Sequence, residues 1–194
     1  MSVRCSFALR RESKAGVFLA WIALAGPLGA DSVYDGTMSG DVISPPVSTT
    51  ATGTIDLLLH EHLLELGVTF SGLSSLATGG HIHCCAEAPT SAGVAILLPT
   101  FPTGVTSAVY DVDLALDSLA TYQASFVTNF GGGTVAGAEA ALIAGVRQQR
   151  AYFCVHSSNY PGSELRAYPD WVSFEDGLEN GDVSGWSSEV GFEP

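Results

Sequence analysis

The chain has 194 residues, of which 46% are hydrophobic and 14% charged, and its seven basic and 20 acidic residues give a formal net charge of −13. A nucleic-acid-binding protein needs a basic surface to displace counterions from phosphates, and seven basic residues cannot supply one. The hydrophobic content excludes a disordered acidic tail, and the 22 glycines and nine prolines exclude a coiled coil. The composition therefore predicts one acidic, loop-rich domain.

Residues 1–30 have the pattern of a secretory signal peptide, in which basic residues precede an apolar run and a small residue marks the cleavage site. The basic residues are Arg4, Arg10, Arg11 and Lys14. The apolar run covers residues 17–25, and cleavage is expected near Ala30. This segment is shorter than the roughly 20 residues of a membrane span, so we expect no span after cleavage. The mature chain would keep three arginines and 19 acidic residues, a net charge of −16, which disfavours anionic partners.

The chain beyond the signal is expected to be a domain of short strands over residues 31–168, followed by an acidic C-terminal tail over residues 169–194. Strand patterns cover residues 31–34, 52–59, 64–70, 81–83, 93–98, 109–116, 151–156 and 165–168. One alanine-rich helix is predicted over residues 136–149, after three glycines. Many short strands with one short helix predict an all-β fold, an antiparallel β-sandwich or partly closed barrel.

Histidines at strand spacing form the main candidate site. His81 and His83 are two residues apart, so their side chains share one face of a strand, and Cys154 and His156 share a face by the same alternation. If the two strands are neighbours, one wall collects His81, His83, His156, Cys85 and Cys154. Imidazole and thiolate together suit copper or zinc, and three histidines leave one position open. The alternative is that these histidines are hydrogen-bonded structural residues. His60 and His62, at a predicted hairpin tip, are expected to be solvated.

The cysteines allow two disulfide pairings. Cys5 leaves with the signal peptide, so an oxidising compartment would act on Cys84, Cys85 and Cys154. Either one of the adjacent cysteines pairs with Cys154, or Cys84 and Cys85 pair with each other and Cys154 stays free. Strand alternation favours a bond between Cys85 and Cys154. That bond would hold the two histidine strands together and remove both sulfurs as metal ligands.

No set of catalytic residues is identified. Ser157 follows His156 directly, but neighbours in sequence do not form the spatial triad that acyl transfer requires. Glu164 and Arg166 are two apart on a predicted strand and are expected to brace the fold as an ion pair.

Several ordered motifs resemble the CHRD domain, which is named for chordin. They are Gly-His-Ile-His-Cys-Cys at residues 80–85, Ala-Tyr-Phe-Cys-Val-His-Ser at residues 151–157, and Asn-Tyr-Pro-Gly-Ser-Glu-Leu-Arg at residues 159–166. Residues 45–53 and 70–73 are similar to the opening of the domain, and the likeness to bacterial exported members covers about residues 31–168. The resemblance implies a secreted β-sandwich. Its His-x-His strand is similar to the copper strand of Cu/Zn superoxide dismutases, so the sandwich is expected to be immunoglobulin-like or dismutase-like.

These observations predict a non-catalytic, periplasmic or extracellular binding module whose partner is an extracellular protein, a surface polymer or a metal ion. The alternative is a copper carrier or a superoxide dismutase-like enzyme that uses His81, His83 and His156. A dismutase needs a positive surface to guide superoxide, and three arginines among 19 acidic residues do not provide it. The enzyme is therefore the less favoured hypothesis, whereas the copper carrier is unaffected.

Overall fold

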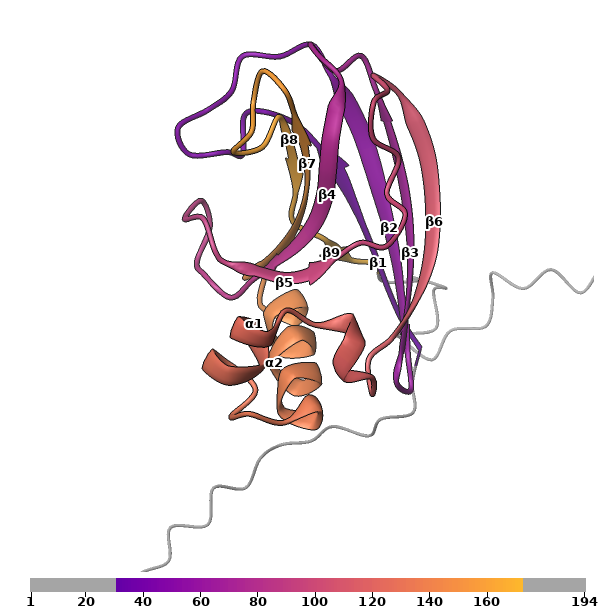
Figure 1. Cartoon of the computed structure of the whole chain (residues 1–194), viewed down its shortest axis with the longest axis vertical. Coiled ribbons are helices and arrows are strands. Elements are labelled where there is room, and N and C mark those ends of the chain that lie inside the picture. The colour runs from indigo at the N-terminus through magenta and orange to yellow at the C-terminus, as the bar shows by residue number, and fades with distance from the viewer. Residues whose placement is uncertain (1–30, 173–194) are drawn as a thin grey trace, which may run out of the picture.

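Two antiparallel β-sheets face each other across an apolar core in the computed structural model, which describes residues 31–172 (Figure 1). The expected signal peptide and most of the expected tail lie outside these residues. The first sheet has the strand order β6-β3-β2-β1-β9 and the second β5-β4-β7-β8. The strands are β1 (Ser32–Met38), β2 (Thr52–His60), β3 (Leu63–Ser71), β4 (Ala77–Cys84), β5 (Val94–Leu97), β6 (Ala108–Ala115), β7 (Ala151–Ser157), β8 (Leu165–Ala167) and β9 (Asp170–Trp171). The predicted β-sandwich is confirmed, and neither sheet closes into a barrel.

Alternating apolar residues decide which face of each sheet is buried. In β3 the core-facing side chains are Leu64, Leu66, Val68 and Phe70, all at most 2% exposed. In the second sheet Ile82 of β4 pairs with Phe153 of β7, and both side chains are buried in the same core. Because successive strand residues point to opposite faces, the neighbours of Ile82 and Phe153 lie on the outer face of the four-stranded sheet.

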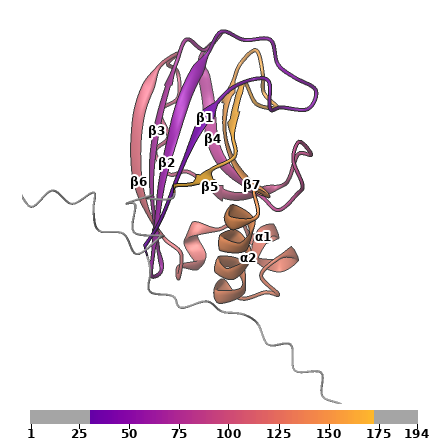
Figure 2. The same ribbon diagram turned by 180° about the vertical axis from the view of Figure 1, so that it is seen from behind.

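Two helices lie together at one end of the sandwich (Figures 1 and 2). The predicted helix is α2 (Val135–Arg147), and its N-cap Thr134 accepts a hydrogen bond from the backbone N–H of Gly137. The sequence did not predict α1 (Ala124–Asn129) or the 3₁₀ turn η1 (Leu119–Thr121), which are too short to show a helical period. Over residues 31–172, no helix is both long and apolar enough to cross a membrane.

His62, in the turn between β2 and β3, joins the five-stranded sheet to α2. Its Nδ1 lies 2.8 Å from Oε1 of Glu139, whose side chain is 8% exposed. This hydrogen bond and the Glu139 charge raise the pKa of His62 above its ordinary value of 6.5. Because the raised pKa belongs to the folded state, the protonated pair stabilises the fold fully below about pH 6.5. The contribution is lost as pH rises through the folded pKa.

A His62→Gln variant is expected to be less stable than the wild type at about pH 5.5 and to approach it at about pH 8, since glutamine carries no titrating charge. Urea unfolding of both proteins at the two pH values measures the difference in the free energy of unfolding. A difference that is the same at both pH values would contradict the assignment.

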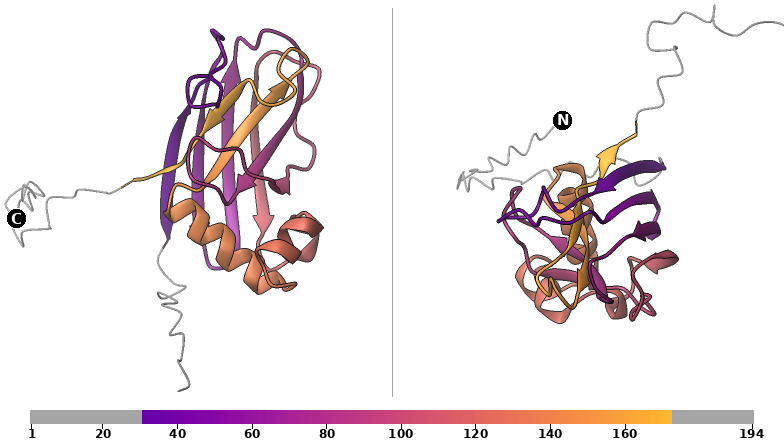
Figure 3. Two further views of the ribbon diagram at one scale, coloured as in Figure 1. Left: turned by 90° about the vertical axis from the view of Figure 1, so that its left-hand side faces the viewer. Right: turned by 90° about the horizontal axis from the view of Figure 1, so that it is seen from above.

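Three loops rise around the outer face of the four-stranded sheet (Figure 3). They are the β1–β2 loop (residues 39–51), the β4–β5 loop (residues 85–93) and the β7–β8 loop (residues 158–164). The loops bury side chains that an open sheet face would leave in water. Tyr152, Cys154 and Arg166, all on this face, are at most 2% exposed. The loops therefore enclose this face around β7 and β8, whereas Leu97 of β5, opposite His81, is 51% exposed.

Candidate metal centre

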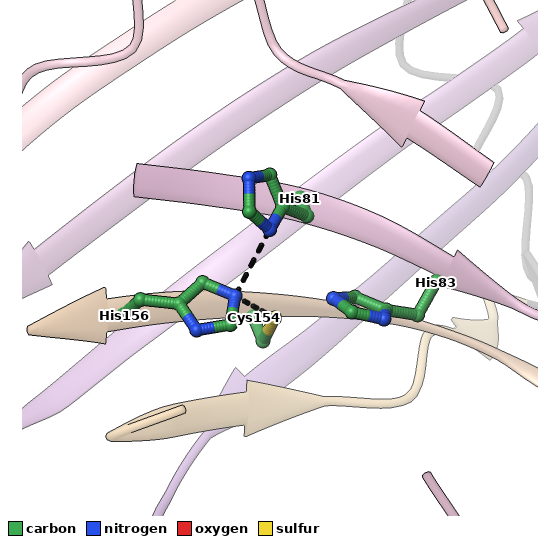
Figure 4. A group of neighbouring side chains, drawn as sticks. All are labelled: His81, His83, Cys154 and His156. Atoms are coloured by element: carbon green, nitrogen blue, oxygen red, sulfur yellow. Dashed lines mark hydrogen bonds between the residues drawn. The ribbon is translucent and has the colours of Figure 1, made fainter. Parts of the chain in front are cut away.

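Strands β4 and β7 are neighbours, and they bring His81, His83, Cys154 and His156 together on the outer face of the sheet (Figure 4). His81 and Cys154 are directly opposite in the strand register. One possible ligand atom from each of the four side chains lies within 4.8 Å of all the others. The three histidines named by the sequence thus converge, and a thiol joins them.

The distances within this cluster of four centre on His156. Its Nε2 lies 3.0 Å from Nδ1 of His81 and 3.1 Å from Sγ of Cys154. Cys154 is 1% exposed, and His83 and His156 are each 9% exposed. His81 is the most accessible of the four. Gly79 lies beside this ring, since a Cβ at that position would be 3.5 Å from Nε2 of His81, an ordinary van der Waals contact.

Two backbone carbonyls determine which ring nitrogen of His83 and of His156 carries the proton and which carries the lone pair. Nδ1 of His83 donates to the carbonyl oxygen of Ala92 at 2.9 Å, and Nδ1 of His156 donates to that of Pro161 at 2.8 Å. The Nε2 atom of each ring therefore carries a lone pair. Metal-binding histidines are oriented in this way by hydrogen bonds from the opposite ring nitrogen. The His83 Nε2 atom is buried without a hydrogen-bond partner, a costly state that a metal ion would relieve.

The protonation states of the cluster suit a metal ion. Burial lowers the pKa of His83 to about 4, and it also lowers the pKa values of His81 and His156. The three imidazoles are therefore neutral at pH 7, as metal ligation requires. Burial raises the pKa of the Cys154 thiol to about 12, so the thiol keeps its proton until a cation displaces it. Three nitrogens and one sulfur are the donor set that results.

The model of the CHRD domain matches residues 34–168. The chain belongs to the CHRD domain family. No curated protein and no solved structure matched it. The CHRD domain expected from the sequence motifs is thereby confirmed, and all four residues of the cluster lie within the matched range.

The cysteine pairing in this CHRD domain corrects the favoured prediction. Cys84 and Cys85 form a disulfide with each other, and Cys154 is free. The register explains the difference, because Cys154 pairs with His81 whereas Cys84 pairs with Ala151. Cys85 therefore lies four residues along the strand from the partner of Cys154, about 13 Å away at the usual strand rise, beyond disulfide reach. The Cys154 sulfur is therefore available as a ligand.

The remaining candidate residues of the CHRD domain lie outside the cluster. Nε2 of His60 is 3.0 Å from Oε1 of Glu65, so His60, like His62, pairs with a carboxylate instead of being only solvated. Ser157 is fully buried and its hydroxyl donates to Glu164, so this hydroxyl is not an exposed nucleophile.

The expected ion pair between Glu164 and Arg166 is not formed, because their side chains turn to different loops. Glu164 accepts hydrogen bonds from Thr49, Ser74 and Ser157. Arg166 donates to the carbonyl oxygen of Pro89 and to Oγ of Ser91, both at 3.1 Å. The two charges are thus held apart, and Arg166 lies beside the candidate metal centre, opposite Cys154 in the strand register.

Proposed function

We propose that this CHRD domain is a secreted, non-catalytic module that binds one transition-metal ion of the copper and zinc class through His81, His83, Cys154 and His156. The convergence of four ligand atoms within 4.8 Å carries the proposal. The buried, unpartnered Nε2 of His83 supports it independently. CHRD domains occur in extracellular or periplasmic proteins, which agrees with the expected signal peptide.

The donor set supports copper or zinc over harder ions. Imidazole and thiolate bind zinc and copper, whereas magnesium and calcium prefer carboxylate, carbonyl and water oxygens. Acidic side chains do not belong to this cluster, although they are common elsewhere in the chain. Four protein donors also match the tetrahedral coordination typical of structural zinc sites.

Closure of the site favours binding over catalysis. A catalytic metal keeps a coordination position for water or substrate. Here Cys154 supplies a fourth donor, and the loops bury Cys154, His83 and His156 almost completely. The limited exposure of His81 gives a path for an ion to enter or leave. A carrier or storage role for the ion fits this arrangement better than superoxide chemistry.

Metal titration tests the proposal. Purified metal-free protein is expected to bind one equivalent of Co²⁺ or Zn²⁺, followed by Co²⁺ absorption and by mass spectrometry under native conditions. His83→Ala is expected to lose the one-to-one complex, because it removes the nitrogen that has no other partner. His60→Ala is the matched control, since His60 lies outside the cluster. Absence of binding by the wild type, or equal loss in both variants, would overturn the proposal.

A further inference from the structure

Arg166 places a buried positive charge beside the candidate metal centre. It lies opposite Cys154 in the pairing of β7 with β8, and its side chain is 2% exposed. Directly opposed residues on one sheet face have Cβ atoms about 5 Å apart. The guanidinium carbon lies 4.0 Å from the centre of the Tyr152 ring. That ring in turn stacks on His83, with centroids 4.9 Å apart and planes 6° apart.

Among the described residues, 31–172, no carboxylate neutralises this charge. The ion pairs within 4.0 Å there involve other side chains and leave Arg166 without an acidic partner. Its hydrogen bonds go to neutral groups, namely the carbonyl of Pro89, the Ser91 hydroxyl and the Tyr168 hydroxyl. A buried charge is costly unless it is paired. Cys154 lies opposite Arg166 in the strand register, and its sulfur becomes an anion once a metal ion displaces its proton.

We propose that Arg166 sets the charge selectivity of the site and makes it favour a monovalent ion, Cu⁺, over divalent Zn²⁺. This inference rests on the proposed function. Three neutral imidazoles and one thiolate carry a charge of −1, which Arg166 offsets. The charge of the ion is then left uncompensated in a buried site. Repulsion between the ion and Arg166 is twice as large for a divalent as for a monovalent ion at the same position.

Competition titrations of wild type, Arg166→Gln and Arg166→Lys test the inference. Chromogenic chelators for Cu⁺, under anaerobic conditions, and for Zn²⁺ give the ratio of the two affinities in each protein. Arg166→Gln is expected to shift this ratio toward Zn²⁺ by about tenfold or more, because it removes the charge. Arg166→Lys retains the charge and is expected to keep the ratio near that of the wild type.

A second variant neutralises Arg166 without removing it. Ser91 is exposed and its Oγ accepts a hydrogen bond from Arg166, so Ser91→Asp places a carboxylate against the guanidinium. Ser91→Asp is expected to shift the ratio toward Zn²⁺, and the neutral control Ser91→Asn is not. This pair decides the question if Arg166→Gln does not fold.

The outcomes separate the inference from the proposed function. Unchanged ratios in both Arg166→Gln and Ser91→Asp, with metal still bound, would overturn the selectivity role and leave the metal site standing. Failure of the wild type to bind either ion would overturn the proposed function itself.

Discussion

Replacing Cys154 with serine is expected to lower the affinity for Co²⁺ and Cu⁺ by at least about 100-fold, the upper end of losses seen when residues around a metal site are changed. Serine keeps the size of the side chain but offers a hydroxyl in place of the soft, polarizable thiolate. The absorption band from sulfur-to-cobalt charge transfer is also expected to disappear. Titration of metal-free protein with Co²⁺, followed by absorption spectroscopy, measures both effects.

The adjacent cysteines provide the control for Cys154→Ser. Cys84 and Cys85 are joined to each other, so their sulfurs are not free to ligate the ion. A double Cys84→Ser, Cys85→Ser variant that folds is expected to keep the charge-transfer band. Persistence of the band in Cys154→Ser would show that Cys154 is not a ligand.

Gly80→Ala is expected to destabilise the fold by about 1–3 kcal/mol, the usual cost of inserting a methyl group into a well-packed core. Gly80 faces the core from β4, and a Cβ there would lie 2.6 Å from the Phe101 ring. That ring cannot move aside easily, because it stacks on Phe70 at 5.8 Å and packs edge-on against Tyr110 at 5.2 Å. Urea unfolding at fixed pH gives the change in the free energy of unfolding.

Gly93→Ala is the matched control for Gly80→Ala. Gly93 is exposed beside the same sheet, and a Cβ there meets no atom within 4 Å. Its substitution is expected to leave stability nearly unchanged or to raise it slightly through the unfolded chain. Equal losses in the two alanine variants would show that crowding at Phe101 is not the cause.

Strand alternation was the part of the candidate site that the sequence could predict. It placed His81 with His83, and Cys154 with His156, because side chains two residues apart share a face. Alternation within one strand does not predict the register between two strands, because the register depends on contacts across the whole sheet. The wrong disulfide followed from this gap and from the end of β4 at Cys84, beyond which Cys85 packs against the core and α2 instead of sharing the face of Cys154.

The contacts that the sequence could not predict are made by the loops. The carbonyls that orient His83 and His156 belong to Ala92 and Pro161, and any residue supplies a carbonyl. The isolation of Arg166 from Glu164 likewise depends on where three loops fold. The sandwich itself was predictable, because alternating runs such as residues 64–70 follow from the need to bury one face. The short helix α1 left no comparable periodic signal.

The two faces of β4 and β7 have different roles, one in the core and one in the candidate site. Ile82 and Phe153 point into the core, whereas the candidate ligands point away from it toward the loops. Substitutions on the loop side are therefore expected to change the candidate site while the sandwich stays assembled. A metal-stripped chain should remain folded, unlike a zinc finger. A variant that lacks the candidate ligands is therefore expected to keep the same sandwich.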